Sequence, residues 1–127
     1  MMDEQQGKNI EGIGDIRERI DAEDLVVKCG VRVDLKGSEY LVDAIILYGL
    51  RSERGSCNIY NKIGKARGVK TKTVMREITY ALRQSFGLPE RLSQLVGVAI
   101  PTSEIHNALV VGYLGRLLLR NRVMQAE

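Results

Sequence analysis

Apolar side chains recur every three or four positions along most of the chain beyond residue 14. This spacing is typical of amphipathic α-helices, and no segment alternates for long enough to predict a strand. The predicted helices cover residues 15–29, 39–51, 58–66, 71–86 and 89–96, and a last helix runs from just after Pro101 to about residue 122. We therefore predict an all-α single domain of about six helices.

Residues at the ends of these segments suit helix boundaries. Gly30 ends the first helix, Ser38 is a candidate N-cap of the second, and Pro89 suits the first turn of the fifth. Thr102 or Ser103 would cap the last helix. Residues 1–14 are rich in glycine and poor in apolar side chains, so we predict a flexible acidic tail there, followed by a helical domain over residues 15–127.

The last predicted helix carries apolar residues around most of its circumference, whereas a surface helix needs a single apolar stripe. Two explanations remain open: the helix lies at the centre of the domain, or part of it forms an interface with a partner. The residues concerned are Ile105, Leu109, Val110, Val111, Tyr113, Leu114, Leu117, Leu118 and Leu119.

Composition excludes several functional classes. The chain has 127 residues, 44% hydrophobic and 28% charged, which is ordinary for one soluble domain. Cys29 and Cys57 are far apart, and His106 has no neighbouring ligand residue, so neither a disulfide framework nor a metal site is indicated. No catalytic pattern, secretory signal or membrane-spanning run stands out. We expect a cytoplasmic, non-enzymatic protein without cofactor or metal.

Residues 58–86 have the pattern of a helix-turn-helix. Ile63 faces inward from the first helix, and Gly64 is small enough for a second helix to cross closely over it. Gly68 stands where the turn requires a positive φ angle, which glycine adopts at little cost. Val69 and Val74 then supply the apolar contacts between the two helices.

Positive charge is concentrated in the same segment, although the net charge of the chain is only +3. The first 24 residues are predominantly acidic. Such asymmetry favours a basic face that binds a polyanion, while the acidic end stays away from it. The basic residues concerned are Lys62, Lys65, Arg67, Lys70, Lys72, Arg76 and Arg83.

The helix predicted at 71–86 has two distinct faces at about 100° per residue. Its inner arc holds Val74, Ile78, Ala81, Leu82 and Ser85. The opposite face carries cations, hydroxyls and a phenol, which suit contacts with phosphates and base edges in a major groove. We expect Arg76 to read bases, since a guanidinium can hold both O6 and N7 of guanine. The other candidate DNA contacts are Lys62, Lys65, Arg67, Lys70, Thr71, Lys72, Thr73, Tyr80 and Arg83.

The chain resembles the C-terminal DNA-binding effector domain of the stage 0 sporulation protein A family of response regulators. The similarity spans about residues 15–119. It depends on residues 36–45 (KGSEYLVDAI), residues 59–63 (IYNKI) and residues 101–104 (PTSE), together with Val74, Arg76, Ile78 and Ala81. The resemblance implies a six-helix domain that binds promoter DNA through its third and fourth helices and activates or represses transcription.

Two departures from that family change the expectation. The family usually has Arg at the position of Thr73, Glu at that of Met75 and often His at that of Tyr80, so the preferred DNA sequence is expected to differ. The family also carries a phosphoacceptor receiver domain, for which residues 1–14 are too few. We therefore expect either an excised effector domain or a relative that lacks phosphorylation control.

Two functions remain in competition. The first is a sequence-specific transcription regulator that binds double-stranded promoter DNA, with RNA polymerase and a second copy of the chain on the DNA as further candidate partners. The second is a helical adaptor whose basic face binds an acidic protein. Binding to duplex DNA that weakens steeply with salt would favour the regulator.

Overall fold

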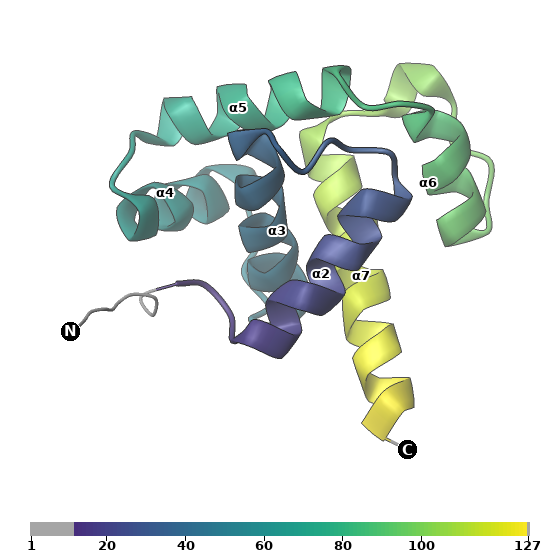
Figure 1. Ribbon diagram of the computed structural model, residues 1–127, viewed down its shortest axis with the longest axis horizontal. Coiled ribbons are helices and arrows are strands. Elements are labelled where there is room, and N and C mark those ends of the chain that lie inside the picture. Colours follow the sequence, from purple (N-terminus) through teal and green to yellow (C-terminus); the bar gives the residue numbers. More distant parts are fainter. Residues whose placement is uncertain (1–11, 127) are drawn as a thin grey trace.

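The computed structural model of the protein describes residues 12–126, so the predicted tail lies mostly outside the described residues. Within that range the chain forms six α-helices and one short 3₁₀ turn, and no strand is present (Figure 1). The all-α single domain is thereby confirmed. Its elements are α2 (Ile16–Lys28), α3 (Lys36–Gly49), α4 (Ser56–Arg67), α5 (Thr71–Arg83), α6 (Leu88–Val96), η2 (Thr102–Glu104) and α7 (Asn107–Ala126).

Helix α3 is the central element, and most of its residues are buried. In Figure 1 it descends from the middle of α5 beside α7, while α2 crosses in front of it. Glycine permits these close crossings. A Cβ on Gly37 would lie 2.0 Å from the carbonyl oxygen of Glu77 in α5, and one on Gly49 would lie 2.2 Å from that of Gly115 in α7. The helix backbones therefore approach almost to contact.

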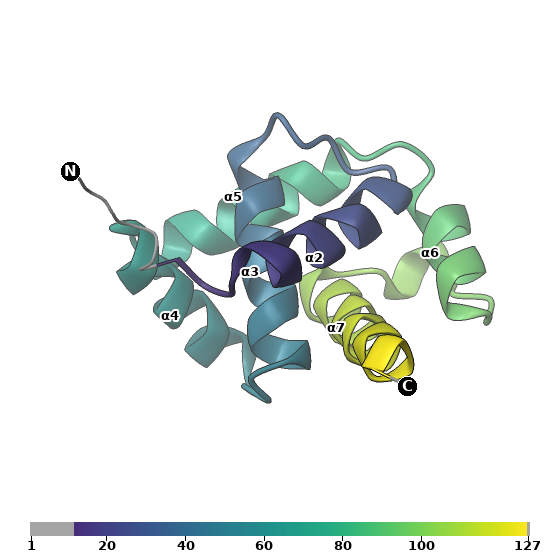
Figure 2. The ribbon, with the colours of Figure 1, turned by 60° about the horizontal axis from the view of Figure 1, so that its bottom comes forward.

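Helix α7 is buried along its first half and exposed at its far end. Val110, Leu114 and Leu118 are almost fully buried, whereas Val123 and Met124 are mostly exposed. Figure 2 looks nearly along α7 and shows α2 and α3 beside it, with its C-terminal end reaching past them. Of the two explanations for its apolar circumference, central burial accounts for the first half. The far end would be the part available to a partner.

Two predicted caps are wrong. Helix α3 begins at Lys36 after an extended Leu35, so Ser38 lies buried within its first turn and not before it. The last helix begins at Asn107, because Ile105 has an extended backbone that separates Thr102–Glu104 as a single 3₁₀ turn. Helix α5 also ends earlier than predicted, at Arg83, and the following segment is held where Phe86 N–H donates to Gly30 O at 2.9 Å.

The first described residues are tied to the domain. Ile13, which the sequence pattern assigned to the tail, packs against the core. Asp15 caps α2 by accepting from the backbone N–H of Glu18 at 2.8 Å, and the Glu18 side chain accepts in return from the Asp15 N–H at 2.9 Å. This reciprocal capping box satisfies donors that the start of a helix otherwise leaves unpaired.

No helix in the described part of the chain is long and apolar enough to cross a membrane.

Candidate nucleic-acid interface

Helices α4 and α5 are joined by a tight turn over residues 68–70. Gly68 has φ 70° and ψ 33°, the left-handed conformation expected for it, and Val69 N–H donates to Gly64 O at 2.9 Å. Gly64 is buried, and a Cβ there would lie 2.6 Å from the carbonyl oxygen of Val69. Both glycines therefore have the local roles that the sequence predicted, since neither a positive φ nor this close approach suits a larger residue.

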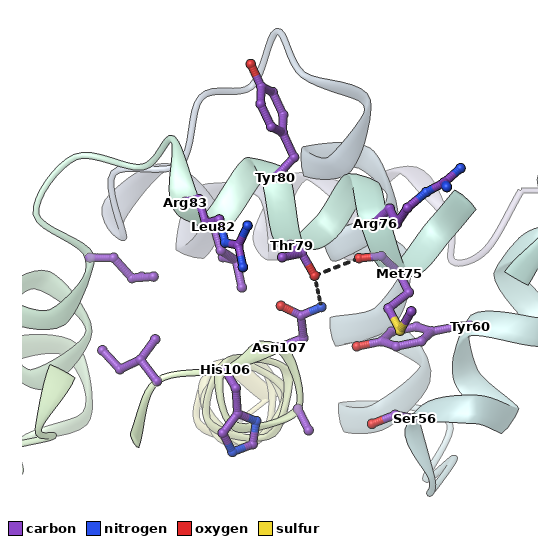
Figure 3. Close-up of a pocket in the computed structure, with 13 residues that line it drawn as sticks. Ser56, Tyr60, Met75, Arg76, Thr79, Tyr80, Leu82, Arg83, His106 and Asn107 are labelled. Atoms are coloured by element: carbon purple, nitrogen blue, oxygen red, sulfur yellow. Dashed lines mark hydrogen bonds between the residues drawn. The ribbon is translucent and has the colours of Figure 1, made fainter. Parts of the chain in front are cut away.

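The two faces of α5 are also as predicted. Val74, Ile78 and Ala81 are fully buried against the core, whereas Tyr80 is half exposed. Figure 3 shows the side chain of Arg76 directed away from α7, and that of Tyr80 beside the loop between α2 and α3. Lys72, Arg76, Tyr80 and Arg83 are all exposed, and Thr71 and Thr73 are half-buried at the start of the helix. Helix α5 thus presents a cationic outer face.

The candidate cations differ in what they contact. Lys62 Nζ lies 2.6 Å from Glu53 Oε2, and Arg67 is paired with two carboxylates, Glu39 and Asp43. Five other candidates make no ion pair with any residue between 12 and 126: Lys65, Lys70, Lys72, Arg76 and Arg83. These five are exposed and have no ion-pair partner within that range to be displaced before they bind an anion.

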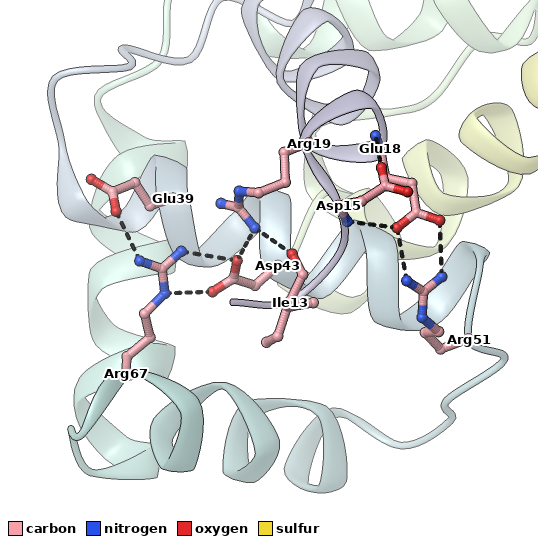
Figure 4. A network of polar contacts seen from close by, with 8 residues as sticks. All are labelled: Ile13, Asp15, Glu18, Arg19, Glu39, Asp43, Arg51 and Arg67. Atoms are coloured by element: carbon pink, nitrogen blue, oxygen red, sulfur yellow. Dashed lines mark hydrogen bonds and ion pairs between the residues drawn. The ribbon is translucent and has the colours of Figure 1, made fainter. Parts of the chain in front are cut away.

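Arg67 is part of an ionic cluster inside the domain (Figure 4). Its Nε and Nη2 donate to the two oxygens of Asp43 at 2.9 and 3.0 Å, and its Nη1 donates to Glu39 at 3.1 Å. Hydrogen bonding to Asp43 raises the pKa of Arg67 above its ordinary value, against the opposing effect of burial. Although the sequence made Arg67 a candidate DNA contact, its guanidinium is already occupied within the protein.

Asp43 is the centre of that cluster and is fully buried. Arg19 of α2 donates from Nη1 to Asp43 at 2.6 Å and to the carbonyl of Ile13 at 2.8 Å. One carboxylate of α3 therefore joins α2 and the first described residues to the last turn of α4. This role of Asp43 was not predicted from the sequence, although an acidic residue within the apolar segment 40–47 was a signal for it.

A groove of about 770 Å³ runs beside α5, between that helix and the start of α7 (Figure 3). Its polar wall is a short chain of hydrogen bonds: Asn107 Nδ2 donates to Thr79 Oγ1 at 2.8 Å, and Thr79 Oγ1 donates to the carbonyl of Met75 at 2.9 Å. Burial raises the pKa of Tyr60 above its ordinary value, while hydrogen bonds to Asn107 and Ser56 oppose that shift. The groove could not be predicted from the sequence, because its walls come from α4, α5, the start of α6 and the start of α7.

The described residues contain no group of three or more His, Cys, Asp and Glu side chains placed to hold a metal ion. His106 is exposed, and its Nδ1 accepts from the Leu109 N–H at 3.4 Å, so it lies at the start of α7.

No protein-family model, curated protein or solved structure matches this chain.

Proposed function

We propose that the protein is a non-enzymatic, sequence-specific DNA-binding transcription regulator. In this proposal α4, the turn at Gly68 and α5 form a helix-turn-helix, and α5 enters the major groove of duplex DNA. The observation that carries the proposal is the outer face of α5 with its adjacent turn. Five exposed cations lie on α4, on the turn and on α5 without an internal ion pair among residues 12–126.

Different residues have different roles in this proposal. Arg76, near the middle of α5 and directed outward in Figure 3, would read bases, with Thr73 and Tyr80 about one helical turn away on either side of it in the sequence. Lys65 and Lys70 flank the turn and would hold phosphates, which fixes orientation but carries no sequence information. We assign Arg67 to the scaffold and not to DNA, because Asp43 and Glu39 already hold it.

The resemblance to the stage 0 sporulation protein A effector domains supports the same reading, with six helices and with α4 and α5 in the positions of the DNA-binding pair. Membership of that family is itself part of the proposal. Of the three altered residues, Thr73 and Tyr80 lie about one helical turn from Arg76 on the same flank of α5, which supports a preference for a different operator sequence, whereas Met75 lines the groove on the other flank.

A titration of fluorescently labelled duplex at several salt concentrations tests the proposal. The logarithm of the affinity should fall with the logarithm of salt by about 0.9 for each neutralised phosphate, so five cations set a limit of about 4.5. The double variant Lys72→Glu/Arg76→Glu should lose most of the affinity. The double variant Arg116→Glu/Arg120→Glu, which reverses two exposed cations of α7, is the matched control and should bind like wild type.

Selection of bound sequences from a random duplex pool would then give the operator. A flat salt response, or equal loss in the two charge-reversal variants, would contradict the DNA proposal. Binding to an acidic protein through the same face, with no affinity for duplex, would instead favour the adaptor.

A further inference from the structure

The groove beside α5 combines an apolar lining with one-sided charge. Met75, Leu82, Leu88, Ile105 and Ala108 supply apolar surface, while the ionisable lining residues are Arg76, Arg83, His106 and the two tyrosines. Neither Asp nor Glu lines it. A volume of about 770 Å³ lies within the usual range for small-molecule sites, of about 300–1,000 Å³.

The polar groups of the wall already have partners. Thr79 Oγ1 accepts from Asn107 and donates to the Met75 carbonyl, and the Tyr60 hydroxyl, which Asn107 and Ser56 approach, belongs to a residue only 5% exposed. These groups therefore need no hydrogen bond from a ligand. An apolar molecular body can cover them without leaving a buried donor or acceptor unpaired.

Charge remains unsatisfied at the rim. In Figure 3 the guanidinium of Arg83 lies beside Leu82 at the edge of the groove, whereas the guanidinium of Arg76 points away from the groove. Arg83 is exposed and forms no ion pair in the described part of the chain. A guanidinium in this position is suited to a carboxylate, which it can hold with two parallel hydrogen bonds.

We propose that the groove between α5 and the start of α7 binds an organic carboxylate with an apolar, ring-sized body, anchored at Arg83. The apolar body lies against Met75, Leu88 and Ile105, and the carboxylate pairs with Arg83 at the rim. A phosphodiester or free phosphate supplies the charge but no apolar body, so it leaves the floor of the groove uncovered.

The occupied groove would also affect DNA binding, and this part rests on the proposed function. Arg83 is one of the five exposed cations of the proposed DNA-binding face, and a ligand carboxylate would take its guanidinium away from DNA. Ligand and duplex therefore compete, and the coupling is reciprocal.

The binding test uses three probes on the full-length, ¹⁵N-labelled chain, each followed by amide chemical shifts. The probes are 1-naphthoate, the uncharged 1-naphthamide and inorganic phosphate. We expect naphthoate to shift the amides of Thr79, His106 and Ala108 and to bind at least tenfold more tightly than either of the others. Equal affinity for naphthamide, no binding of naphthoate, or shifts confined to another surface would overturn the proposal.

Two variants examine the site itself. Ala108→Phe places a ring in the groove from an exposed position and should weaken naphthoate binding at least tenfold, whereas Ala99→Phe, exposed and outside the groove lining, should leave it unchanged. Arg83→Met keeps an unbranched side chain without charge and should reduce the naphthoate affinity to that of naphthamide. Wild-type affinity in Ala108→Phe or Arg83→Met would also contradict the site.

A duplex titration with and without saturating naphthoate then measures the coupling. Naphthoate should weaken duplex binding by wild type and have no effect on Arg83→Met. If the protein binds no duplex, the proposed function fails, while the amide shifts still decide whether the groove is a carboxylate site.

Discussion

Arg67 and Asp43 form a two-point ion pair that fastens the last turn of α4 to the middle of α3. Both donor–acceptor distances are 2.9–3.0 Å, and the Asp43 side chain is fully buried. Arg19 reaches the same carboxylate from α2 at 2.6 Å. Two guanidinium groups thus depend on one buried negative charge, and the orientation of α4 depends on all three residues.

Neutralising Asp43 should therefore destabilise the protein strongly. In Asp43→Asn, part-buried Arg19 loses its carboxylate partner and Arg67 keeps only the more exposed Glu39, and breaking a buried ion pair in this way costs about 3–5 kcal/mol. Urea unfolding of the variant measures the loss. Asp34→Asn is the matched control, because its pair with Arg32 is more than half exposed on both sides and should contribute little to stability. Equal losses of unfolding free energy in the two variants would show that the buried cluster contributes no more to stability than an exposed ion pair.

Much of the fold followed from local pattern, and the exceptions have physical reasons. The buried arc of α5 and the left-handed Gly68 were predicted, because helical periodicity and backbone sterics act within a few residues. Ser38 was assigned wrongly, because α3 starts a turn earlier and buries it.

The candidate site was predicted less completely than the fold. Arg67 pairs with Asp43, a residue 24 positions away, and no periodicity within one helix reveals such a contact. The groove depends likewise on where α7 begins relative to α5, which is a property of packing between distant segments. Local patterns thus identified which side chains lie outside the core, but they did not show which side chains form ion pairs with each other.

The glycines of α3 and α7 offer a second prediction. Gly49→Ala should lower the free energy of unfolding by about 2 kcal/mol or more, because its Cβ would lie 2.2 Å from the Gly115 carbonyl oxygen and force the helices apart. Gly112→Ala, one turn from that crossing, meets only Tyr48 at 3.8 Å. It should stabilise the protein by about 0.5–1 kcal/mol through helix propensity. Thermal and urea unfolding measure whether each substitution stabilises or destabilises the protein. A stabilising effect of Gly49→Ala would contradict the close crossing of α3 and α7.

The two cysteines should react very differently with a thiol reagent. Burial raises the pKa of Cys29 to about 12, and the side chain is inaccessible, whereas Cys57 is exposed at the start of α4. At pH 8 only about 1 in 10⁴ Cys29 thiols would be ionised, and the thiolate is the reactive form. Ellman's reagent should therefore modify one thiol in the native protein and both in urea. Rapid modification of native Cys57→Ser would contradict the burial of Cys29.

The stability of the protein should fall on acidification partly through Glu18. The hydrogen bond from Arg51 lowers the pKa of Glu18 below its ordinary value, against desolvation, which raises it. The unfolded chain then takes up a proton at a higher pH than the folded one, so this contribution is complete above about pH 4.5 and is lost as the pH falls through the folded pKa.

Comparison with Glu18→Gln isolates that contribution. At pH 7 the wild type should be about 1 kcal/mol more stable, since the variant loses the charge that pairs with Arg51, and the difference should shrink toward pH 3. Unfolding at each pH gives the two curves. Glu23→Gln, an exposed residue of the same helix, should differ from wild type by less than about 0.5 kcal/mol at pH 7. If the stability difference between wild type and Glu18→Gln grew on acidification, the pKa of Glu18 would be raised in the folded protein and not lowered.

The last prediction separates base reading from phosphate binding in the proposed DNA complex. Arg76→Ala should cost about 1–3 kcal/mol on the best selected duplex and much less on a scrambled one, because a guanidinium that holds a guanine edge discriminates between bases. Lys65→Ala should weaken both duplexes by a similar factor and reduce the salt slope by about 1, as expected for a single phosphate contact. Both side chains are exposed and unpaired within the described range, so neither change should alter stability by more than about 0.5 kcal/mol. If Lys65→Ala instead relaxed the sequence preference while Arg76→Ala acted uniformly, the N-terminal side of the turn, and not the middle of α5, would face the bases.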